Sequence, residues 1–351
     1  MKRESRFCPF TPHAPRSTPS SRPSPRARVV FLGTPEFAVP ALLQLLAAPE
    51  IEVALVVTQP DQPAGRGRRL TASPVKARAL EHGLPVFQPE RLRGAAALER
   101  LAAADADLFV IAAYGQILRQ PVLDLPARGC LNVHPSLLPH HRGPAPIAAA
   151  ILAGDDETGA TIMLTDAGMD TGPILTQRRL ALTGRETTAS LTPRLASLGA
   201  DLLVETIPRW LRGEIEPLEQ DPALATYSRL FTRADGLVDW SRPAVELSRQ
   251  IRALNPWPRA YTHAGAARLL LLDAVPLPPD SADGTPAAAP GTVIAGRDGG
   301  FVVATGRGAL LALEVQSEGR RPMPGAHFLR ARRDLVGANL TAEARTSARG
   351  T

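Results

Sequence analysis

The hydrophobic residues between positions 28 and 213 fall into short, β-branched runs separated by stretches of helical spacing. The runs end in turn residues, which is typical of buried strands; they are RVVFLG, IEVALVV, LPVFQ, DLFVIAAY, CLNVH and ATIMLT. The helical stretches between them include VPALLQLLAA, SPVKARALEHG, AALERLAAA and PIAAAILAG. In the second, Ser73 is the expected N-cap, Pro74 the first helical residue and Gly83 the stop. This alternation predicts an α/β, Rossmann-like domain with a mostly parallel sheet covered on both faces, over residues 29–213.

The second half of the chain has a different pattern. One long helix is predicted within 187–213, and residues 214–234 are polar, broken by proline and expected to be a linker. A helix over 243–254 is followed by the short strands ARLLLLDAV, GTVIAGR, GFVVATG and GALLALEVQ with glycine turns. This spacing predicts a smaller, mostly antiparallel β-barrel of OB-like type over residues 235–340.

The two ends of the chain lack a core-forming pattern. Residues 1–28 are rich in Pro, Ser and Arg with one acid, Glu4, so we expect a disordered basic extension there and a disordered tail over 341–351. An organellar transit peptide shares this composition, but the prolines argue against the amphipathic helix it requires.

Composition narrows the class of protein. A length of 351 residues suggests two domains, and no apolar run reaches the roughly 20 residues that span a bilayer. The net charge of +6 indicates a possible polyanionic partner. A genome whose base composition favours arginine codons would give the same excess of positive charge. The two cysteines, Cys8 and Cys130, exclude a disulfide framework and suit a reducing compartment, so we expect a cytoplasmic protein.

The first strand carries no nucleotide signature. It ends in FLGTPEF, where a dinucleotide site would need G-x-G-x-x-G and only Gly33 is present. No G-x-x-x-x-G-K-[ST] occurs. The scaffold is Rossmann-like without the marks of NAD or nucleoside triphosphate binding.

The segment GCLNVHPSLLPHHRGPAP (129–146) concentrates candidate chemistry at the end of a strand, where ligands of parallel sheets bind. Side chains alternate along a strand, so Asn132 and His134 share one face. Three alternatives compete: a metal site, a nucleophilic cysteine and metal-free acyl transfer. A metal site would recruit His134, His140 and His141, but adjacent histidines rarely face one ion and no H-x-x-x-H spacing is present. Cys130 lies within an apolar strand and is expected to be structural.

Asp170 adds a carboxylate in DAGMDTGPIL, between Gly168 and Gly172. Its simplest role is to stabilise a turn, but it follows a neighbouring strand and could reach His134. That pairing would raise the pKa of His134 and favour the imidazolium. Asn132, His134 and Asp170 together suit attack of an amine on a carbonyl: two groups donate hydrogen bonds to the oxyanion and the carboxylate relays the proton.

The segment TQPDQPAGRGRRLTASPVK (58–76) gathers four cations around a single acid, Asp61. The cations, Arg66, Arg68, Arg69 and Lys76, form either a solvated loop or a phosphate-binding footprint. Gly65 and Gly67 favour binding, because they let the loop adapt to a nucleic-acid backbone.

The motifs NVHPSLLPHHRGPAPI and TDAGMDTGPIL resemble the folate-dependent formyltransferases. The resemblance implies that Asn132, His134 and Asp170 are catalytic, without a metal, and that the formyl donor is 10-formyltetrahydrofolate. It also implies a folate-site loop formed by Ser136, Leu137, Leu138 and Pro139. The chain departs from the family at Pro135, where Gly is more usual, and at His140–His141, which replace a basic-aromatic pair.

Three further segments, FLGTPEFAVPAL, TQPDQPAGRGRRLTASPVK and IRALNPWPRAY, are similar to the members that formylate the amine of methionyl-initiator tRNA. This implies a monomer active in translation initiation, whose arginine loop, Arg66 above all, engages the acceptor stem and whose C-terminal domain binds the rest of the tRNA. Two alternatives stay open. One is a formyltransferase for a small amine, such as glycinamide ribonucleotide or an amino-sugar nucleotide. The other is a non-catalytic RNA-binding module, which would not need the three polar residues together.

Overall fold

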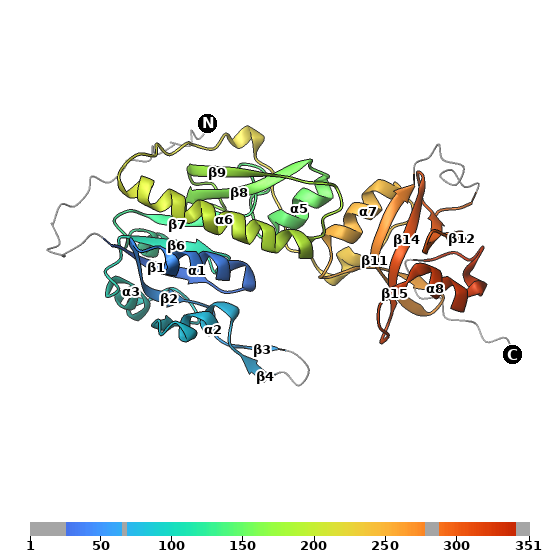
Figure 1. Ribbon diagram of the computed structural model, residues 1–351, viewed down its shortest axis with the longest axis horizontal. Coiled ribbons are helices and arrows are strands. Elements are labelled where there is room, and N and C mark those ends of the chain that lie inside the picture. Colours follow the sequence, from blue (N-terminus) through green and yellow to red (C-terminus); the bar gives the residue numbers. More distant parts are fainter. Residues whose placement is uncertain (1–25, 65–68, 278–287, 342–351) are drawn as a thin grey trace, which may run out of the picture.

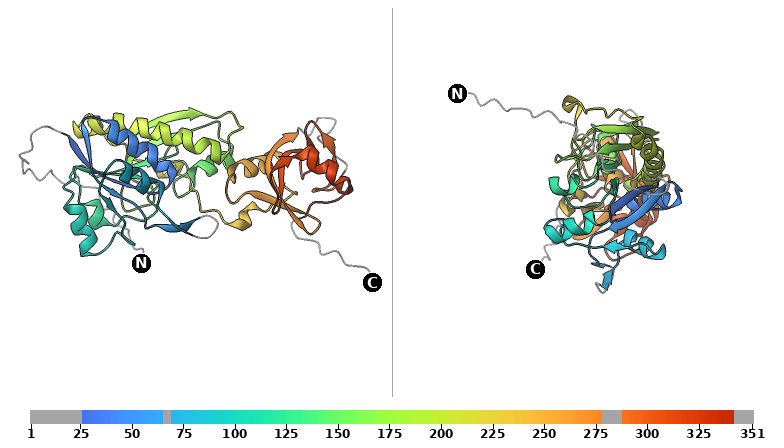
Figure 2. Two further views of the ribbon diagram at one scale, coloured as in Figure 1. Left: turned by 60° about the horizontal axis from the view of Figure 1, so that its bottom comes forward. Right: turned by 90° about the vertical axis from the view of Figure 1, so that its left-hand side faces the viewer.

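The structure is a computed structural model that describes residues 26–64, 69–277 and 288–341. Two lobes lie along the longest axis of the molecule (Figures 1 and 2). The first strand already begins at Ala27, two residues before the predicted domain boundary. Most of the predicted basic extension and the predicted tail after Thr341 lie outside the described residues.

The larger lobe is built on a seven-stranded sheet in the described part of the chain, in the order β5-β2-β1-β6-β7-β8-β9. Its strands are β1 (Ala27–Gly33), β2 (Ile51–Val57), β5 (Val86–Phe87), β6 (Leu108–Ala112), β7 (Cys130–His134), β8 (Glu157–Leu164) and β9 (Ile174–Ala181). The first five run parallel, whereas β8 pairs antiparallel with both β7 and β9. The predicted mostly parallel sheet is therefore confirmed. We did not predict β9, whose outer face alternates polar residues as an edge strand does.

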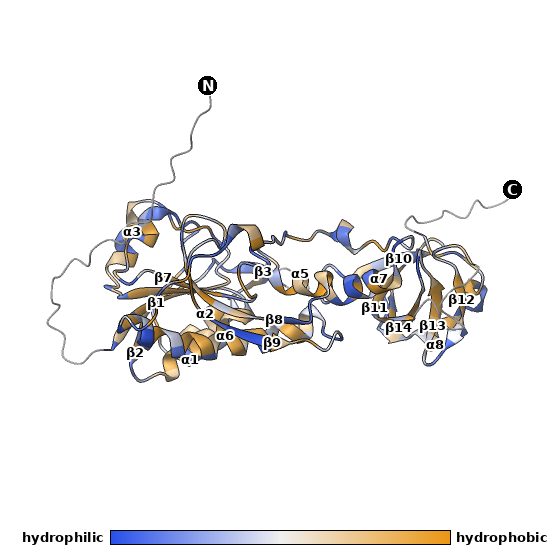
Figure 3. Ribbon diagram, turned by 90° about the horizontal axis from the view of Figure 1, so that it is seen from above, coloured by the Kyte–Doolittle hydropathy of each residue, from blue (hydrophilic) through white to orange (hydrophobic). Residues whose placement is uncertain are grey.

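Helices cover both faces of this sheet because its strands are apolar on both sides. Val29 and Phe31 of β1 lie in one core and Val30 and Leu32 in the other. The helices are α1 (Val39–Ala47), α2 (Pro74–Glu81), α3 (Ala95–Ala102), α4 (Gln120–Leu123), α5 (Pro146–Ala153) and α6 (Thr188–Leu211). Helices α1 and α6 contribute to the first core, and α3 and α4 to the second. Figure 3 shows the hydrophobic colour concentrated on the central strands between the helices.

The smaller lobe is an antiparallel sheet in the order β10-β11-β14-β13-β12, with β15 paired to β14. Its strands are β10 (Ala260–Ala264), β11 (Ala267–Leu277), β12 (Val293–Arg297), β13 (Gly300–Ala304), β14 (Ala309–Ser317) and β15 (Met323–Pro324), with helices α7 (Ala244–Ala253) and α8 (Gly325–Ala331). The predicted strands are present, while β10, β15 and α8 were not predicted. The regular pairing leaves β10 and β12 at opposite ends, so it does not by itself establish an OB-like barrel.

The segment 214–234, predicted as a linker, packs along the larger lobe. It leaves α6 and returns over the sheet to the smaller lobe (yellow in Figure 1). Single bridges join Leu218 to Ile174 and Tyr227 to Arg142. Two 3-10 turns, η2 (Pro222–Leu224) and η3 (Arg233–Gly236), bracket its second half. The segment is thus part of the surface that surrounds the candidate site.

The two lobes also touch through α7. The Thr188 hydroxyl donates to the Ala253 carbonyl at 2.6 Å, and Arg252 donates to the Glu186 carbonyl at 2.9 Å. Among the described residues, no helix combines the length and apolar character needed to cross a membrane.

Candidate active site

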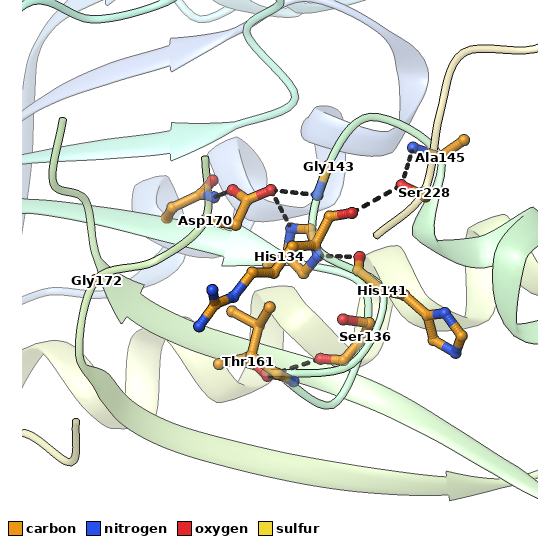
Figure 4. A network of polar contacts seen from close by, with 12 residues as sticks. His134, Ser136, His141, Gly143, Ala145, Thr161, Asp170, Gly172 and Ser228 are labelled. Carbon is orange, nitrogen blue, oxygen red and sulfur yellow. Dashed lines mark hydrogen bonds and ion pairs between the residues drawn. The ribbon is translucent and has the colours of Figure 1, made fainter. Parts of the chain in front are cut away.

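Strand β7 presents Asn132 and His134 on one face, as its alternation predicts. Leu131 and Val133 point into the core on the other side. The Asn132 amide nitrogen lies 3.4 Å from Asp170 Oδ1, and His134 Nδ1 lies 3.7 Å from Asp170 Oδ2 (Figure 4). The three residues that the sequence singled out therefore meet around one carboxylate.

Asp170 reaches this position by a route that the sequence did not predict. Strand β8 is antiparallel to β7, so its last residue, Leu164, pairs with Leu131 at the start of β7. The following loop must fold back over the face of β7 to bring Asp170 to His134. Asp170 has a left-handed backbone (φ 52°), and its Oδ2 accepts the Gly143 N–H at 2.7 Å. The carboxylate is thus held by the loop that follows β7.

His134 is buried, with 4% of the residue's surface exposed. Its Nε2 lies 3.1 Å from the His141 carbonyl oxygen, which can only accept, so Nε2 carries the hydrogen. The Nδ1 atom then has a free lone pair towards Asp170, in keeping with a separation longer than a hydrogen bond.

Burial sets the charge of His134. Loss of hydration lowers its pKa, and this outweighs the raising effects of the Asp170 carboxylate and the His141 carbonyl. The Asp170 carboxylate does raise the pKa of His134, as predicted, but the predicted preference for the imidazolium is wrong, because the ring is almost completely desolvated while the carboxylate stays partly exposed and 3.7 Å from Nδ1. The resting site holds a neutral imidazole.

The neighbouring histidines point elsewhere. His140 is exposed, and the His141 ring nitrogen Nε2 contacts Asp155 Oδ2 at 2.6 Å. Only the His141 backbone faces His134, so the three imidazoles that a metal site would recruit do not converge. In the described ranges, no group of three or more His, Cys, Asp or Glu is arranged to hold a metal ion.

Cys130 is a structural residue, as predicted. It is 2% exposed, and burial, together with the nearby Asp124 charge, raises the pKa of its thiol to about 12. A thiol of this kind is not a nucleophile at neutral pH.

The predicted folate-site loop is rigidly held, and two of its side chains point inward. Ser136 is fully buried and donates to the His140 carbonyl at 2.6 Å. Leu138 is buried against Met163 and Ile174. Leu137 and Pro139 remain half-buried, so within this loop their side chains are the accessible ones.

A pocket of about 800 Å³ opens beyond the carboxyl ends of β2 and β6, next to the point where the strand order reverses between β1 and β6. Its lining residues include Gln59, Leu92, Gln116, Ile117 and Arg119. The Gln116 side chain accepts the Leu92 N–H at 3.1 Å, which fixes the wall. The pocket was not predicted, although a glycine directly after a buried strand, Gly115, was an available signal; it has φ 85°.

The four predicted tRNA-binding cations have different environments. Strands β3 (Gln62–Ala64) and β4 (Arg69–Thr71) form a hairpin that projects from the larger lobe (Figure 1). Arg66 and Arg68 lie outside the described residues, and Arg69 is exposed. Lys76 forms an ion pair with Asp61 at 2.7 Å, so its charge is already compensated within the protein.

The chain matches the family described as "Formyl transferase" over residues 27–207, and "Formyl transferase, C-terminal domain" over residues 231–333. It therefore belongs to the formyltransferase family, as its motifs predicted. It is 50% identical over 313 residues to the methionyl-tRNA formyltransferase of Roseiflexus sp. (strain RS-1), covering 89% of this chain and 95% of that protein. It is 51% identical over 304 residues to the protein of the same name from Chloroflexus aurantiacus (strain J-10-fl), covering 86% and 96%.

A solved structure shares the fold. The N-formyltransferase from Helicobacter canadensis, in complex with folinic acid and dTDP-3-aminofucose, superposes with a TM-score of 0.60 at 16% identity, covering 82% of this chain and 98% of that one. At this identity the likeness establishes the architecture alone.

Proposed function

We propose that this protein transfers the formyl group of 10-formyltetrahydrofolate to the free amine of methionyl-initiator tRNA, for the initiation of translation. The relatives at about half identity that carry this activity in their names align over nearly their whole length. The observation that carries the proposal is the convergence of Asn132 and His134 on Asp170 at a single carboxylate.

The geometry suggests how these residues act. The methionyl amine attacks the formyl carbon, and the carbonyl oxygen gains negative charge that the Asn132 amide stabilises by a hydrogen bond. The amine must lose a proton, which the His134–Asp170 pair takes up. Once protonated, both ring N–H groups of His134 have an acceptor, His141 O on one side and Asp170 on the other. The C–N10 bond of the folate then breaks and N10 receives the proton, so the site returns to its neutral resting state.

We infer that the co-substrate occupies the pocket beside β6 together with the exposed parts of the Ser136–Pro139 loop. Its volume of about 800 Å³ suits a ligand of this size, and its position on the carboxyl edge lies beside β7. The Gln116 carboxamide is bonded to the Leu92 N–H and to the Pro89 and Glu90 carbonyls, so it shapes the wall against which the ligand would lie.

The acceptor tRNA is proposed to meet the β3–β4 hairpin and the smaller lobe. Arg66, Arg68 and Arg69 would neutralise phosphates of the acceptor stem, with Lys76 contributing if it leaves Asp61. Single bridges from His263 to Thr341 and from Thr292 to Asn339 span the gap between β10 and β12, which supports a small OB-like barrel. We further propose that the protein acts as a monomer in the cytoplasm.

The test is to incubate the protein with methionyl-initiator tRNA and 10-formyltetrahydrofolate and to measure the mass of the aminoacyl group. A formyl adduct in wild type that is absent in His134→Ala supports the proposal. Formylation of a small amine, with none of the charged tRNA, would favour a small-amine formyltransferase instead. Binding of tRNA with no formylation of any amine would indicate an RNA-binding module.

A further inference from the structure

Gln220 is a buried amide in the segment predicted as a linker, and it joins the two loops that carry the site. The residue is 8% exposed. Its Oε1 accepts Arg142 Nε at 3.0 Å and Arg142 Nη2 at 2.8 Å. Its Nε2 donates to the Asp170 carbonyl at 2.9 Å and to the Gly172 carbonyl at 2.7 Å. All four hydrogen-bonding positions of one amide are used within the site.

The chemistry of these partners leaves one orientation for the amide. Arginine can only donate and a backbone carbonyl can only accept, so Oε1 must face Arg142 and Nε2 must face the Asp170 loop. A carboxylate at position 220 could serve Arg142 but would place an acceptor against two carbonyl oxygens. Only glutamine, at this length, satisfies both sides.

The partners of Gln220 adjoin the groups that contact the imidazole. Arg142 lies between His141, whose carbonyl accepts from His134 Nε2, and Gly143, whose N–H donates to Asp170 Oδ2. On the other side, the Asp170 carbonyl belongs to the residue whose carboxylate faces His134 Nδ1. Gln220 therefore fixes the separation of two loops that touch opposite edges of the same ring.

The Asp170 loop needs such a constraint. Asp170 has φ 52°, a left-handed backbone that L-residues other than glycine adopt only at some cost. A Cβ at Gly172 would lie 1.9 Å from the Leu164 carbonyl oxygen, so the chain passes close to β8. Hydrogen bonds from Gln220 to carbonyls on both sides of Thr171 offset this cost and hold the carboxylate in one place.

Arg142 shows why the partner is neutral. It is 3% exposed, and in the described part of the chain its guanidinium bonds to Gln220 and the Tyr227 hydroxyl and pairs with no carboxylate. A neutral acceptor satisfies its donors without a second acid, so Asp170 remains the carboxylate available to His134.

We propose that Gln220 is a positioning residue for formyl transfer: it holds Asp170 in register with His134 and Asn132 by tying the Asp170 loop to Arg142. The inference rests on the proposed function for its effect on turnover. It also makes the segment 214–234 a structural part of the catalytic domain.

The experiment compares Gln220→Met with Gln250→Met. Gln250 is a matched control: it is 6% exposed, and its Nε2 also donates to two backbone carbonyls, those of Asp235 at 2.8 Å and Leu237 at 3.1 Å, away from the site. Both variants should lower Tm. Only Gln220→Met should lower kcat, by about 10–10²-fold, because small displacements of catalytic groups are costly. KM values for tRNA and formyl donor should stay within about twofold.

A readout without substrate isolates the positioning role. In Gln220→Met the carboxylate loses its register with His134, so NMR titration should find the pKa of His134 lower than in wild type, while Gln250→Met leaves it unchanged. Gln220→Glu keeps the acceptor for Arg142 and removes the two donors. It should match Gln220→Met in kcat with less loss of Tm, and it serves as the second variant if Gln220→Met does not fold.

If Gln220→Met and Gln220→Glu keep wild-type kcat and the wild-type pKa of His134, and lose only stability, Gln220 is a structural residue and the proposal is wrong. Failure of the proposed function has a different signature: wild type itself would not formylate charged tRNA. The comparison of His134 pKa values would still decide the role of Gln220.

Discussion

Two segments stood out in the sequence, and they differ in how far they are buried in the structure. Residues 129–146 pack into the core: His134 and Ser136 are buried, and their side chains bond to backbone carbonyls of the same segment, those of His141 and His140. The hairpin of β3 and β4 projects from the lobe with the side chain of Arg69 in solvent. The first arrangement is preorganised around one carboxylate and the second is open.

The difference in burial fits the different requirements of catalysis and of polyanion binding. Stabilising a transition state requires donors and bases fixed to within a fraction of an ångström, so the surrounding shell must be rigid. Capturing a polyanion depends on charge and on counterion release, which tolerate a flexible geometry. Substitutions in the two segments should therefore differ in size and in the quantity that they change.

The largest effect is expected for His134→Ala. Removing the proton acceptor should lower kcat by about 10³-fold, while binding of the formyl donor changes little. Single-turnover formylation of charged tRNA measures it, with the exposed His140→Ala as the control from the same loop. A His134→Ala enzyme that keeps more than half its turnover would rule out the catalytic assignment.

Asp170→Asn should give the next largest loss, about 10²-fold in kcat. Asparagine keeps the size, tolerates φ 52° and still accepts from Gly143 N–H, so the fold should survive. The pKa of His134, already lowered by burial, should fall further once the carboxylate charge is gone. NMR titration of His134 is the measurement, and an unchanged pKa would make Asp170 only a turn residue.

The buried neutral imidazole predicts a moderate pH effect on stability. The pKa of His134 is lower in the folded than in the unfolded chain, so between the two values the unfolded state binds more protons. The contribution of the neutral His134 ring to the stability of the fold is therefore fully present above the unfolded pKa of about 6.5, and it is lost as the pH falls towards the folded pKa. Denaturant unfolding at pH 7.5 and 5.5 measures this: the free energy of unfolding should fall more between the two pH values for wild type than for His134→Asn. Equal drops would mean that His134 is not buried as a neutral ring.

Smaller effects are expected at the hairpin. Arg66→Ala and Arg69→Ala should each reduce the salt dependence of tRNA binding by about one unit of slope, with binding of the formyl donor unaltered. Lys76→Ala should change the slope less, because Lys76 is paired with Asp61. Binding isotherms at several salt concentrations give the slopes. Identical slopes for wild type and both arginine variants would remove the hairpin from the tRNA interface.

No loss is expected on chelation. Hydrogen-bond donors and a proton-relaying pair suffice for the proposed acyl transfer, so activity should survive dialysis against a chelator once magnesium for tRNA folding is restored. Stoichiometric zinc whose removal abolishes turnover would reopen the metal alternative.

The local pattern of the chain predicted much of this protein. Apolar runs identified six of the strands of the larger lobe, and Ser73 caps α2 as expected, accepting the Lys76 N–H. The apolar pattern did not predict structured segments that are rich in polar residues. The edge strand β9, with the sequence ILTQRRLA, has too few apolar residues to be recognised. Residues 214–234 are polar and broken by proline, as a linker is, yet they pack beside the site.

Local sequence thus determined which elements form and that Asn132 and His134 share a face, because strand periodicity depends only on neighbouring residues. The tertiary structure alone decided three things: the antiparallel course of β8 that sends Asp170 back over β7, the neutral charge of His134, and the link through Gln220. Each depends on which distant segments meet and on how much water they exclude. Neither quantity can be read from residues that are adjacent in the chain.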